Sequence, residues 1–399
     1  MGRLDIAVAG CGPAGLAAAL LLERDGHAVT LFERFAAPRP LGSGLLIQPT
    51  GLAVLEYLGL GQGLRSIAAR VDRLFGQAAP SRRTVLDVRY AALGQPARFG
   101  LGVHRASLFG LLYDAVRARP IGLETGRTVA ASDGARGHRR LVFADGSAAG
   151  PFDLVIDALG WSSPLAPPAG RELAYGALWA SLDWPEAAGF DPAALQQRYR
   201  AASVMAGVLP IGLVAGRDGP QAALFWSLRA DRLEHWAAEG LDAWKAAVLA
   251  LWPATGALLD QIESAEQLTF SRYAHRTLAR PIGDGLAYVG DSWHSTSPQL
   301  GQGANMALLD AYALALALRT HADLAEALRL YARLRGGHVR LYQVMSRLFT
   351  PVYQSDSRAI PWVRDQIVGP LARLWPADLI QAAMVAGAIG APLKALGLR

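Results

Sequence analysis

The residues from Gly290 to Ala311 have the types and spacing of a binding loop for a large anionic or polyhydroxylated ligand. The apolar run Leu286–Val289 lies between two glycines and predicts a strand, which Asp291 follows closely. A loop with Pro298 and further glycines comes next, and Ala304–Arg319 has the pattern of a helix. The carboxylate can accept hydrogen bonds from hydroxyls, the glycines admit close backbone approach, and the helix N-terminus offers unpaired N–H groups. The alternative is a structural loop that needs glycine only for its turns.

A second glycine-rich turn lies near the N-terminus, between a predicted strand at Leu4–Ala9 and a predicted helix that runs to about Arg24. Another predicted strand, Ala28–Phe32, ends at Glu33, which stands 18 residues after Gly15. Strand, glycine turn, helix, strand and acidic residue in this order are the fingerprint of a dinucleotide-binding site. The expected roles are a tight turn for Gly10, close approach to a pyrophosphate for Gly12, the first helical turn for Pro13, and close helix packing for Gly15. The fingerprint alone does not separate NAD from FAD.

The two motifs together resemble the class A flavoprotein monooxygenases, the family of para-hydroxybenzoate hydroxylase. The resemblance covers residue 4 to about 320 and is most specific in the string GDxxH…PxxGQGxNxAxxDA. In that family the aspartate that matches Asp291 binds the ribityl chain of FAD, and the loop that matches Pro298–Asn305 presents N–H groups to the flavin ring. His104-Arg105 resembles the start of a helix near the FAD phosphates, and residues 42–59 resemble the segment that leads to the flavin ring. The resemblance therefore implies FAD, with cofactor contacts from Gly10, Gly12, Pro13, Ala14, Gly15, Glu33, Arg34, Arg105, Asp291, Pro298, Gly301, Gly303, Ala304 and Asn305.

The resemblance also implies an α/β fold. We expect a Rossmann-type FAD-binding domain interleaved with a smaller, sheet-containing substrate domain, followed by a helical C-terminal region. The expected bounds are 1–70, 99–170 and 279–320 for the FAD-binding domain, 71–98 and 171–278 for the substrate domain, and 321–399 for the helical region. Strand patterns at Val204–Val214, Ala222–Leu228 and Gln267–His275 would form a sheet over the flavin.

Three residues are candidates for substrate contact or catalysis. Tyr273 and His275 alternate on the predicted strand Gln267–His275, so we expect both on one face, which in the family lies near the flavin. Either could help to deprotonate an activated aromatic substrate, and a hydrogen-bonded structural role is the alternative. Trp226 could line an aromatic-binding pocket, although a tryptophan on a sheet more often belongs to the core.

The chain departs from the family pattern at two places. The family usually has an Asp-Gly pair after the strand here spelled DLVIDALG, linked to both FAD and nicotinamide use, but Leu159 stands where its aspartate should be, before Gly160. Asp157 lies two residues earlier and points to the same face if strand geometry persists. Trp293 stands where small alanines are usual, so it either fills space behind the loop or narrows the route to the flavin.

The resemblance implies a monooxygenase. NADH or NADPH would reduce FAD, O₂ would add at the flavin C4a position, and the hydroperoxide would transfer an oxygen atom to a small aromatic or apolar substrate. The leading alternative is an FAD-dependent oxidase or dehydrogenase that takes hydride from its substrate without NAD(P)H, which the lost Asp-Gly pair favours. A flavin-dependent halogenase is disfavoured because its WxWxIP motif is absent, and a flavin-bound scaffold without chemistry is disfavoured by the unchanged flavin loop.

Composition agrees with a soluble enzyme, and we expect a cytoplasmic one because the start, MGRLDIAVAG, lacks the cationic and apolar regions of a signal peptide. The 399 residues suffice for two or three domains, and the single cysteine, Cys11, excludes a disulfide framework or a cysteine metal cluster within the chain. The net charge of +6 comes from dispersed arginines, which disfavours nucleic-acid binding. The apolar stretch Leu379–Leu393 has 15 residues, too few to span a membrane, so we expect it to pack on its own protein or a partner subunit, with peripheral membrane association as the alternative. We expect a monomer or homodimer.

Overall fold

A six-stranded sheet forms the centre of the larger half of the protein. The computed structural model describes residues 2–37, 43–94, 98–372 and 374–398. The strand order is β20-β21-β12-β1-β2-β8, and the edge strand β20 runs antiparallel to a parallel set of five. The strands are β1 (Asp5–Ala9), β2 (Ala28–Glu33), β8 (Gly122–Thr125), β12 (Leu154–Asp157), β20 (Ile282–Gly283) and β21 (Leu286–Tyr288).

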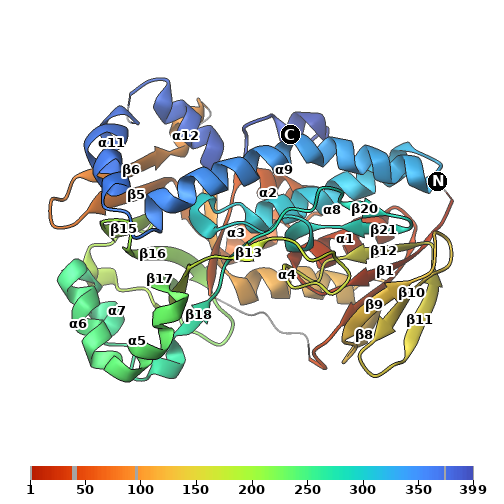
Figure 1. Cartoon of the computed structure of the whole chain (residues 1–399), viewed down its shortest axis with the longest axis horizontal. Helices are drawn as coiled ribbons and strands as arrows, with labels where there is room; N and C mark the ends of the chain where they lie inside the picture. The colour runs from red at the N-terminus through yellow and green to blue at the C-terminus, as the bar shows by residue number, and fades with distance from the viewer. Residues whose placement is uncertain (1, 38–42, 95–97, 373, 399) are drawn as a thin grey trace.

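Both faces of this sheet are covered, which explains why β1 and β12 are continuous apolar runs. Helix α1 (Pro13–Arg24) packs against α8 (Gly303–Thr320), and α8 packs against the 30-residue α9 (Leu324–Tyr353), which runs along the length of the molecule (Figure 1). On the other face, Phe143 and Phe152 of an antiparallel meander contact Phe32 of β2. The meander consists of β9 (Val129–Asp133), β10 (Arg139–Phe143) and β11 (Ala148–Phe152).

Because β1, β2, β12 and β21 are parallel, their carboxyl ends meet at one edge of the sheet. At this edge β1 leads into Gly10, β2 ends at Glu33, β12 ends at Asp157, and β21 leads to Asp291. Two glycine-rich segments far apart in the sequence therefore come together. A small sheet and several helices flank them: β3 (Gly44–Ile47), β4 (Ala69–Val71), β7 (Gly100–His104), α2 (Pro49–Tyr57), α3 (Gly61–Ile67) and α4 (Arg105–Arg117).

A second, seven-stranded sheet has the order β18-β14-β17-β16-β15-β5-β6 and takes its strands from two separate stretches of chain. One of its faces packs on three helices at the lower left of Figure 1, and the other faces β3 and the C-terminal helices. The strands are β5 (Arg73–Ala78), β6 (Thr84–Arg89), β14 (Tyr175–Asp183), β15 (Ala194–Arg200), β16 (Val204–Leu213), β17 (Pro220–Arg229) and β18 (Thr269–Ser271). The helices are α5 (Leu233–Glu239), α6 (Leu241–Leu251) and α7 (Gly256–Leu259).

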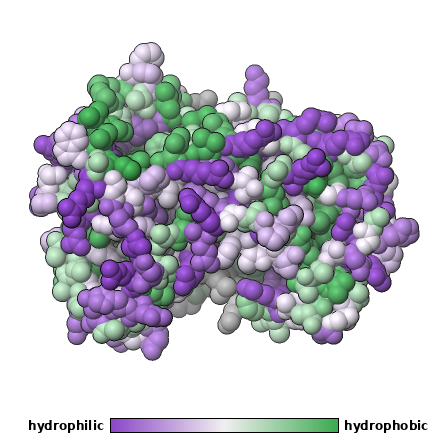
Figure 2. Space-filling view, viewed as in Figure 1, coloured by the Kyte–Doolittle hydropathy of each residue, from purple (hydrophilic) through white to green (hydrophobic). Residues whose placement is uncertain are grey.

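The C-terminal region is helical and lies against β6 and α9, with α11 and α12 at the upper left of Figure 1. It consists of α10 (Ala359–Val363), the π-helical turn η8 (Arg364–Val368), α11 (Gly369–Leu371), α12 (Ala377–Val385) and α13 (Pro392–Ala395). Figure 2 shows apolar side chains gathered on the surface of the same corner. In the described part of the chain, no helix is both long and apolar enough to cross a membrane.

The predicted α/β fold class is confirmed, and the strands expected from apolar runs match β1, β2, β12, β16, β17 and β21 closely. One prediction was wrong: Gln267–His275 is not a single strand. β18 ends at Ser271 beside β14, and β19 (Ala274–His275) pairs instead with β13 (Arg171–Glu172). The chain passes from one sheet to another at Tyr273, a change of partner that no local pattern records.

Candidate functional site

The turn after β1 contains three glycines, Gly10, Gly12 and Gly15, whose surroundings differ. A Cβ at Gly15 would lie 2.0 Å from the carbonyl oxygen of Gly10, and Gly10 itself has a φ of +107° beside Ala158. At Gly12, by contrast, a Cβ would meet no heavy atom within 4 Å in the described part of the chain. The fold thus requires Gly10 and Gly15, whereas Gly12 leaves room for a ligand at the start of α1.

Helix α1 begins in this turn without a side-chain cap, with Pro13 in its first turn and Ala14 buried. Its N-terminal N–H groups therefore keep their capacity for an anion. Cys11 lies in the turn, and burial raises the pKa of its thiol to about 12, so it stays protonated at neutral pH.

Glu33 closes the turn from the end of β2. Its Oε2 accepts a hydrogen bond from the Cys11 N–H at 3.1 Å, and its Oε1 accepts one from the Phe35 N–H at 3.1 Å. Each carboxylate oxygen retains a further lone pair, so ribose hydroxyls can still donate to it. Arg34 is exposed, and its guanidinium lies 4.7 Å from the centre of the Phe35 ring.

The second glycine-rich segment meets the first at the same edge. Asp291 lies in a single 3₁₀ turn, η6 (Gly290–Ser292), and burial raises the pKa of its carboxyl, while His294 and Arg105 offset part of that increase. A second turn, η7 (Pro298–Leu300), ends at Gly301 with a φ of +60°. Pro298 is exposed, Gly303 and Ala304 are half-buried, and α8 starts there without a side-chain cap. Two helices that pack on each other, α1 and α8, thus both start without a side-chain cap, and Gly290 lies between Ala14 of α1 and Ala307 of α8.

Asn305 has a structural side chain within this segment. Its Oδ1 accepts from the Gln48 N–H at 2.8 Å, and its Nδ2 donates to the carbonyls of Leu46 and Gly301. The residue is fully buried, and it fixes the loop before α8 to β3 and α2. The side-chain nitrogen of Gln48 is buried, has no hydrogen-bond partner in the described residues, and lies close to Gly301. It is a donor available at the loop. Residue 42, the first of the 42–59 segment, lies outside the described residues.

Tyr273 lies where the chain leaves β18, and Arg105, the first residue of α4, is close enough to influence it. The Tyr273 hydroxyl accepts a hydrogen bond from Trp179 Nε1 at 3.0 Å, and burial raises its pKa to about 12, with Trp179 and Arg105 opposing that increase. Trp179 also lines a hollow of 220 Å³, with Ser43, Ser181, Arg217, Gln267 and Thr269. The hollow therefore combines an aromatic wall, hydroxyl groups and a cation.

His275 lies apart from Tyr273, contrary to the expectation that the two share a face. Its Nε2 lies 3.1 Å from the Ser346 hydroxyl of α9, and Ser346 also contacts Ser297, which in turn contacts Thr350. Burial, with the nearby Arg347 and Arg171, lowers the pKa of His275, so the imidazole is neutral at pH 7. Since Ser297 immediately precedes Pro298, His275 is connected to the loop that opens α8.

Trp226 is placed away from both glycine-rich segments. It is 6% exposed and belongs to the core between the seven-stranded sheet and α5–α7, together with Leu224 and Trp244. Its neighbour Phe225 lies in a different cluster, with Trp179, because successive strand residues point to opposite faces. The alternation thus puts Trp226 on the face that the helices cover, and we do not retain it as a substrate contact.

The segment that lacks the Asp-Gly pair is held by Asp157 and Arg276. Asp157 is fully buried and accepts from the Leu159 N–H at 3.0 Å and the Ser163 hydroxyl at 2.6 Å, and burial raises its pKa to about 6. Arg276, also buried, donates to the carbonyls of Trp161 and Pro167. Asp157 therefore orders the turn at Leu159 from inside the protein and does not project as a carboxylate from its tip.

Sequence reasoning missed a buried charged cluster behind the site. Asp310 of α8 accepts from the Gly290 N–H at 2.9 Å, His294 Nε2 at 2.5 Å and Arg335 Nε at 2.7 Å, with no exposed surface. Burial alone would raise the Asp310 pKa, but His294 and Arg335 together hold it below its usual value. Arg335 donates in turn to His338, whose pKa burial lowers to about 3. The signal in the sequence that could have indicated this cluster is Asp310, the one carboxylate in the largely apolar stretch 303–320.

Trp293 lies behind the loop. Its ring is 3% exposed, its Nε1 donates to the Leu278 carbonyl at 3.2 Å, and it packs edge-on against Tyr331 of α9. The neighbouring Ser292 hydroxyl donates to the carbonyls of Asp157 and Val289. Of the two readings of Trp293, the structure supports space filling.

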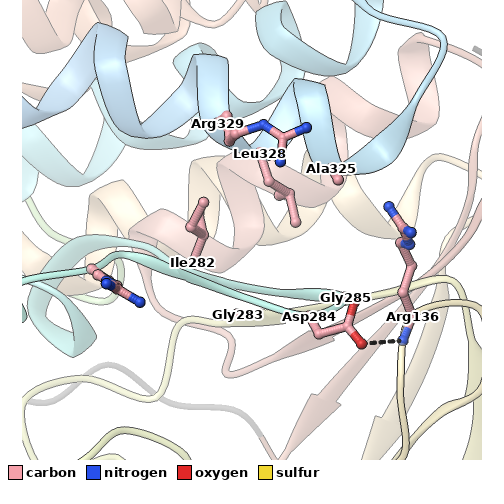
Figure 3. Close-up of a pocket in the computed structure, with 9 residues that line it drawn as sticks. Arg136, Ile282, Gly283, Asp284, Gly285, Ala325, Leu328 and Arg329 are labelled. Carbon is pink, nitrogen blue, oxygen red and sulfur yellow. Dashed lines mark hydrogen bonds between the residues drawn. The ribbon is translucent and has the colours of Figure 1, made fainter.

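A separate pocket of 480 Å³ lies at the opposite edge of the six-stranded sheet, beside Asp284 and Gly285, which precede β21 (Figure 3). The Arg136 N–H donates to Asp284 there, and Leu328 and Arg329 reach in from α9. Because parallel strands place Gly12 and Asp291 at their other ends, this pocket is not part of the glycine-rich site.

Comparisons with known proteins agree with this geometry. Residues 3–141 match the family model described as an FAD binding domain. The chain is 30% identical to 3-amino-4-hydroxybenzoate 2-monooxygenase of Streptomyces cremeus, covering 83% of each, and 27% identical to an FAD-dependent urate hydroxylase of Klebsiella pneumoniae, covering 84% of this chain and 86% of the relative. Its fold is similar to the crystal structure of Klebsiella pneumoniae HpxO complexed with FAD and uric acid, with a TM-score of 0.82, 21% identity and 98% of both chains covered. It is also similar to a tetrameric form of 2-methyl-3-hydroxypyridine-5-carboxylic acid oxygenase, with a TM-score of 0.79, 19% identity, and 99% of this chain and 98% of that one covered.

Proposed function

The chain belongs to the class A FAD-dependent monooxygenases, and from this premise we propose that it uses NAD(P)H and O₂ to oxygenate a small aromatic substrate that carries an anionic or hydroxyl group. It is a flavin-dependent oxidoreductase. The observation that carries the proposal is the edge at which the two glycine-rich segments meet, where α1 and α8 start without side-chain caps and where Arg105 lies close enough to lower the pKa of both Asp291 and Tyr273.

The residues at this edge fit FAD. The open space at Gly12 and the uncapped N-terminus of α1 suit a pyrophosphate, and Glu33 suits the adenosine ribose. Asp291 suits the hydroxyls of a ribityl chain. The α8 N-terminus, together with the Gln48 side-chain nitrogen, which has no partner among the described residues, suits the polar edge of a flavin ring, where a positive dipole end stabilises the charge of the reduced form.

When bound, FAD supplies the redox chemistry by which NAD(P)H electrons and O₂ deliver one oxygen atom to the substrate and one to water. The protein's own residues bind and orient the substrate and exclude water. The hollow beside Trp179 offers an aromatic wall, and Arg217 and Arg105 offer positive charge for a carboxylate or phenolate. With a pKa of about 12, Tyr273 acts there as a neutral hydrogen-bonding group.

His275 is proposed as a positioning residue of the flavin loop. Its neutral imidazole contacts Ser346, and Ser346 contacts Ser297 immediately before Pro298. His275→Ala should retain flavin and lose turnover, and His275→Gln, which can still hydrogen-bond to Ser346, should recover part of it. Unchanged turnover in the alanine variant would remove His275 from the site.

The proposal can be tested by the absorbance spectrum of the purified protein, followed by anaerobic addition of NADPH and then NADH. A bound-flavin spectrum that bleaches with either cofactor and recovers in air supports the proposal. The substrates of the two relatives, 3-amino-4-hydroxybenzoate and urate, are the first probes, and a product heavier by one oxygen atom is the expected outcome. Asp291→Ala should purify largely without flavin, and full FAD occupancy in that variant contradicts the assigned cofactor site.

An oxidase or dehydrogenase is the second candidate, and the inward-facing Asp157 and the Leu159 turn favour it. Anaerobic bleaching of the flavin by a substrate would support this candidate over the first, provided that NADH and NADPH add no bleaching of their own, with or without that substrate.

A further inference from the structure

The C-terminal corner of the protein presents an unusual concentration of apolar side chains to solvent. Of the fourteen large apolar residues that are exposed in the described part of the chain, eleven lie between residues 344 and 380. Trp375 is 81% exposed, Leu348 65% and Trp362 60%. Monomeric proteins rarely expose a contiguous apolar surface of this kind without a function for it. Figure 2 shows it over α11 and α12.

Contacts on the inner side of the segment 359–380 fix its orientation, so that its apolar side chains point to solvent. Arg364, between the exposed Val363 and Ile367, is 2% exposed and donates to the carbonyls of Val352 and Ala201 at 3.0 Å. Gly369 packs so closely on β6 that a Cβ would lie 2.8 Å from the Thr84 carbonyl oxygen. The segment thus buries its arginine and exposes its tryptophan and aliphatic residues, the reverse of an ordinary surface helix.

The charges of the same region indicate what covers it. Residues 333–399 contain nine Lys and Arg against three Asp and Glu. Arg335 and Arg364 of this set are buried and paired with Asp310 and Asp365, so they add nothing to the surface charge. Arg333, Arg340 and Arg347 are exposed at intervals of seven residues, so they follow one face of α9. The exposed Val344 lies between Arg340 and Arg347, and the exposed Leu348 directly follows Arg347. In a two-fold dimer through this surface these arginines would face arginines of the second copy, whereas anionic lipid headgroups would complement them.

We propose that the surface formed by the outer face of α9 and the segment 359–380 binds peripherally to membranes that contain anionic lipid. Tryptophan beside aliphatic residues is typical of proteins that sit at the headgroup boundary, and the flanking arginines supply the electrostatic half of such binding. The surface lies on the membrane and no described helix crosses it.

Helix α12 connects this surface to the loop that opens α8. Its outer side carries Leu379 and Ile380, while the carbonyl of Val385 accepts a 2.5 Å hydrogen bond from the Gln302 side chain, directly before α8. A protein seated on the bilayer would thus have the loop that opens α8 close to the lipid surface. The membrane binding itself does not depend on the proposed reaction.

The test is flotation of the full-length, FAD-loaded protein with vesicles of phosphatidylglycerol and phosphatidylcholine, and with vesicles of phosphatidylcholine alone. The patch variant replaces Leu371, Leu374 and Trp375 by Ser. The matched control replaces the other three exposed large apolar residues, Trp161, Leu213 and Leu249, by Ser. Bound flavin in both variants verifies that they fold.

We expect the wild type and the control variant to bind the anionic vesicles, and to bind vesicles of phosphatidylcholine alone at least tenfold more weakly. The patch variant should bind the anionic vesicles at least tenfold more weakly than the wild type does. Arg340→Gln combined with Arg347→Gln should weaken binding and its dependence on salt. Absence of wild-type binding, or equal losses in patch and control variants, would overturn the proposal. The proposal would also be overturned if the wild type were a dimer in solution, the patch variant were a monomer, and neither bound vesicles.

Discussion

Gly12→Ala should lower cofactor affinity and leave the stability of the apoprotein nearly unchanged, whereas Gly15→Ala should lower that stability. An added Cβ at Gly15 lies 2.0 Å from the Gly10 carbonyl oxygen, whereas one at Gly12 meets nothing within 4 Å in the described structure. Gly12 has a φ of −71° and a ψ of 174°, which alanine adopts without strain. The first substitution disturbs the packing of α1, and the second fills only the space proposed for the pyrophosphate.

The magnitudes follow from these contacts. At Gly15 the contact between Cβ and oxygen must open by roughly 1 Å between two backbone segments, and overpacking of this kind costs about 1–3 kcal/mol. A loss of this size lowers Tm by roughly 2–4 °C per kcal/mol in a domain of this class. At Gly12 the reduced entropy of the unfolded chain and the poorer helix cap oppose each other, each contributing about 0.5–1 kcal/mol, so the apoprotein stays within about 1 kcal/mol of the wild type. We expect FAD affinity to fall at least a hundredfold there, or roughly 2.7 kcal/mol.

The assay pairs thermal unfolding of the flavin-free proteins with FAD titration followed by flavin fluorescence. Gly12→Ala should keep the apoprotein Tm and lose FAD affinity, and Gly15→Ala should lower the apoprotein Tm. Wild-type FAD affinity in Gly12→Ala would refute the placement of the pyrophosphate at this turn. An unchanged apoprotein Tm in Gly15→Ala would refute the packing argument.

Three further substitutions test charges and hydrogen bonds of the site. Asp310→Asn leaves Arg335 buried without its counter-ion and should lower the free energy of unfolding in urea by about 3–5 kcal/mol. The control Glu326→Gln, at an exposed ion pair, should lower it by less than about 1 kcal/mol. Similar losses in the two variants would contradict the role of burial. Tyr273→Phe should retain FAD, raise KM several-fold and leave the kcat profile between pH 6 and 10 unchanged, since the tyrosine pKa is about 12; a shifted pH profile would show that the tyrosine titrates. The folded-state pKa of Asp157 is raised from 3.8 to about 6, so the folded protein binds this proton more tightly, and the contribution of this carboxyl to stability should fall by on the order of 3 kcal/mol as pH rises from about 4 to 6. Asp157→Asn removes this contribution, so over this range the Tm of the variant should fall less, or rise more, than that of the wild type, and equal slopes would contradict the raised pKa.

The elements that hold local patterns could be predicted from the sequence. The turn at Gly10–Gly15 and the strand before Asp291 follow from spacing within a few residues, because a tight turn, an apolar run and a helix start each leave a short signature. The buried strand β12 and the helix α8 were predicted for the same reason, since both are rich in apolar residues and almost wholly buried.

Residues whose roles depend on distant partners could not be predicted. Tyr273 and His275 are two positions apart, yet one contacts Trp179 of the seven-stranded sheet and the other contacts Ser346 of α9. The partners of Asp310 are likewise set by tertiary packing: His294 lies 16 residues away, in the segment after η6, and Arg335 lies 25 residues away in α9. Periodicity specifies a face of an element, and only the tertiary arrangement specifies what that face meets.

The order of strands in the six-stranded sheet has a consequence for synthesis of the chain. Strand β12 lies between β1 and β21, but β21 begins 129 residues after β12 ends. At a translation rate of about 5–20 residues per second, one apolar edge of β12 waits roughly 6–26 s for its partner. An unpaired parallel edge of this kind can pair with other chains. We therefore expect nascent chains shorter than about 290 residues to aggregate or to need a chaperone, and expression at lower temperature to raise the yield of folded protein.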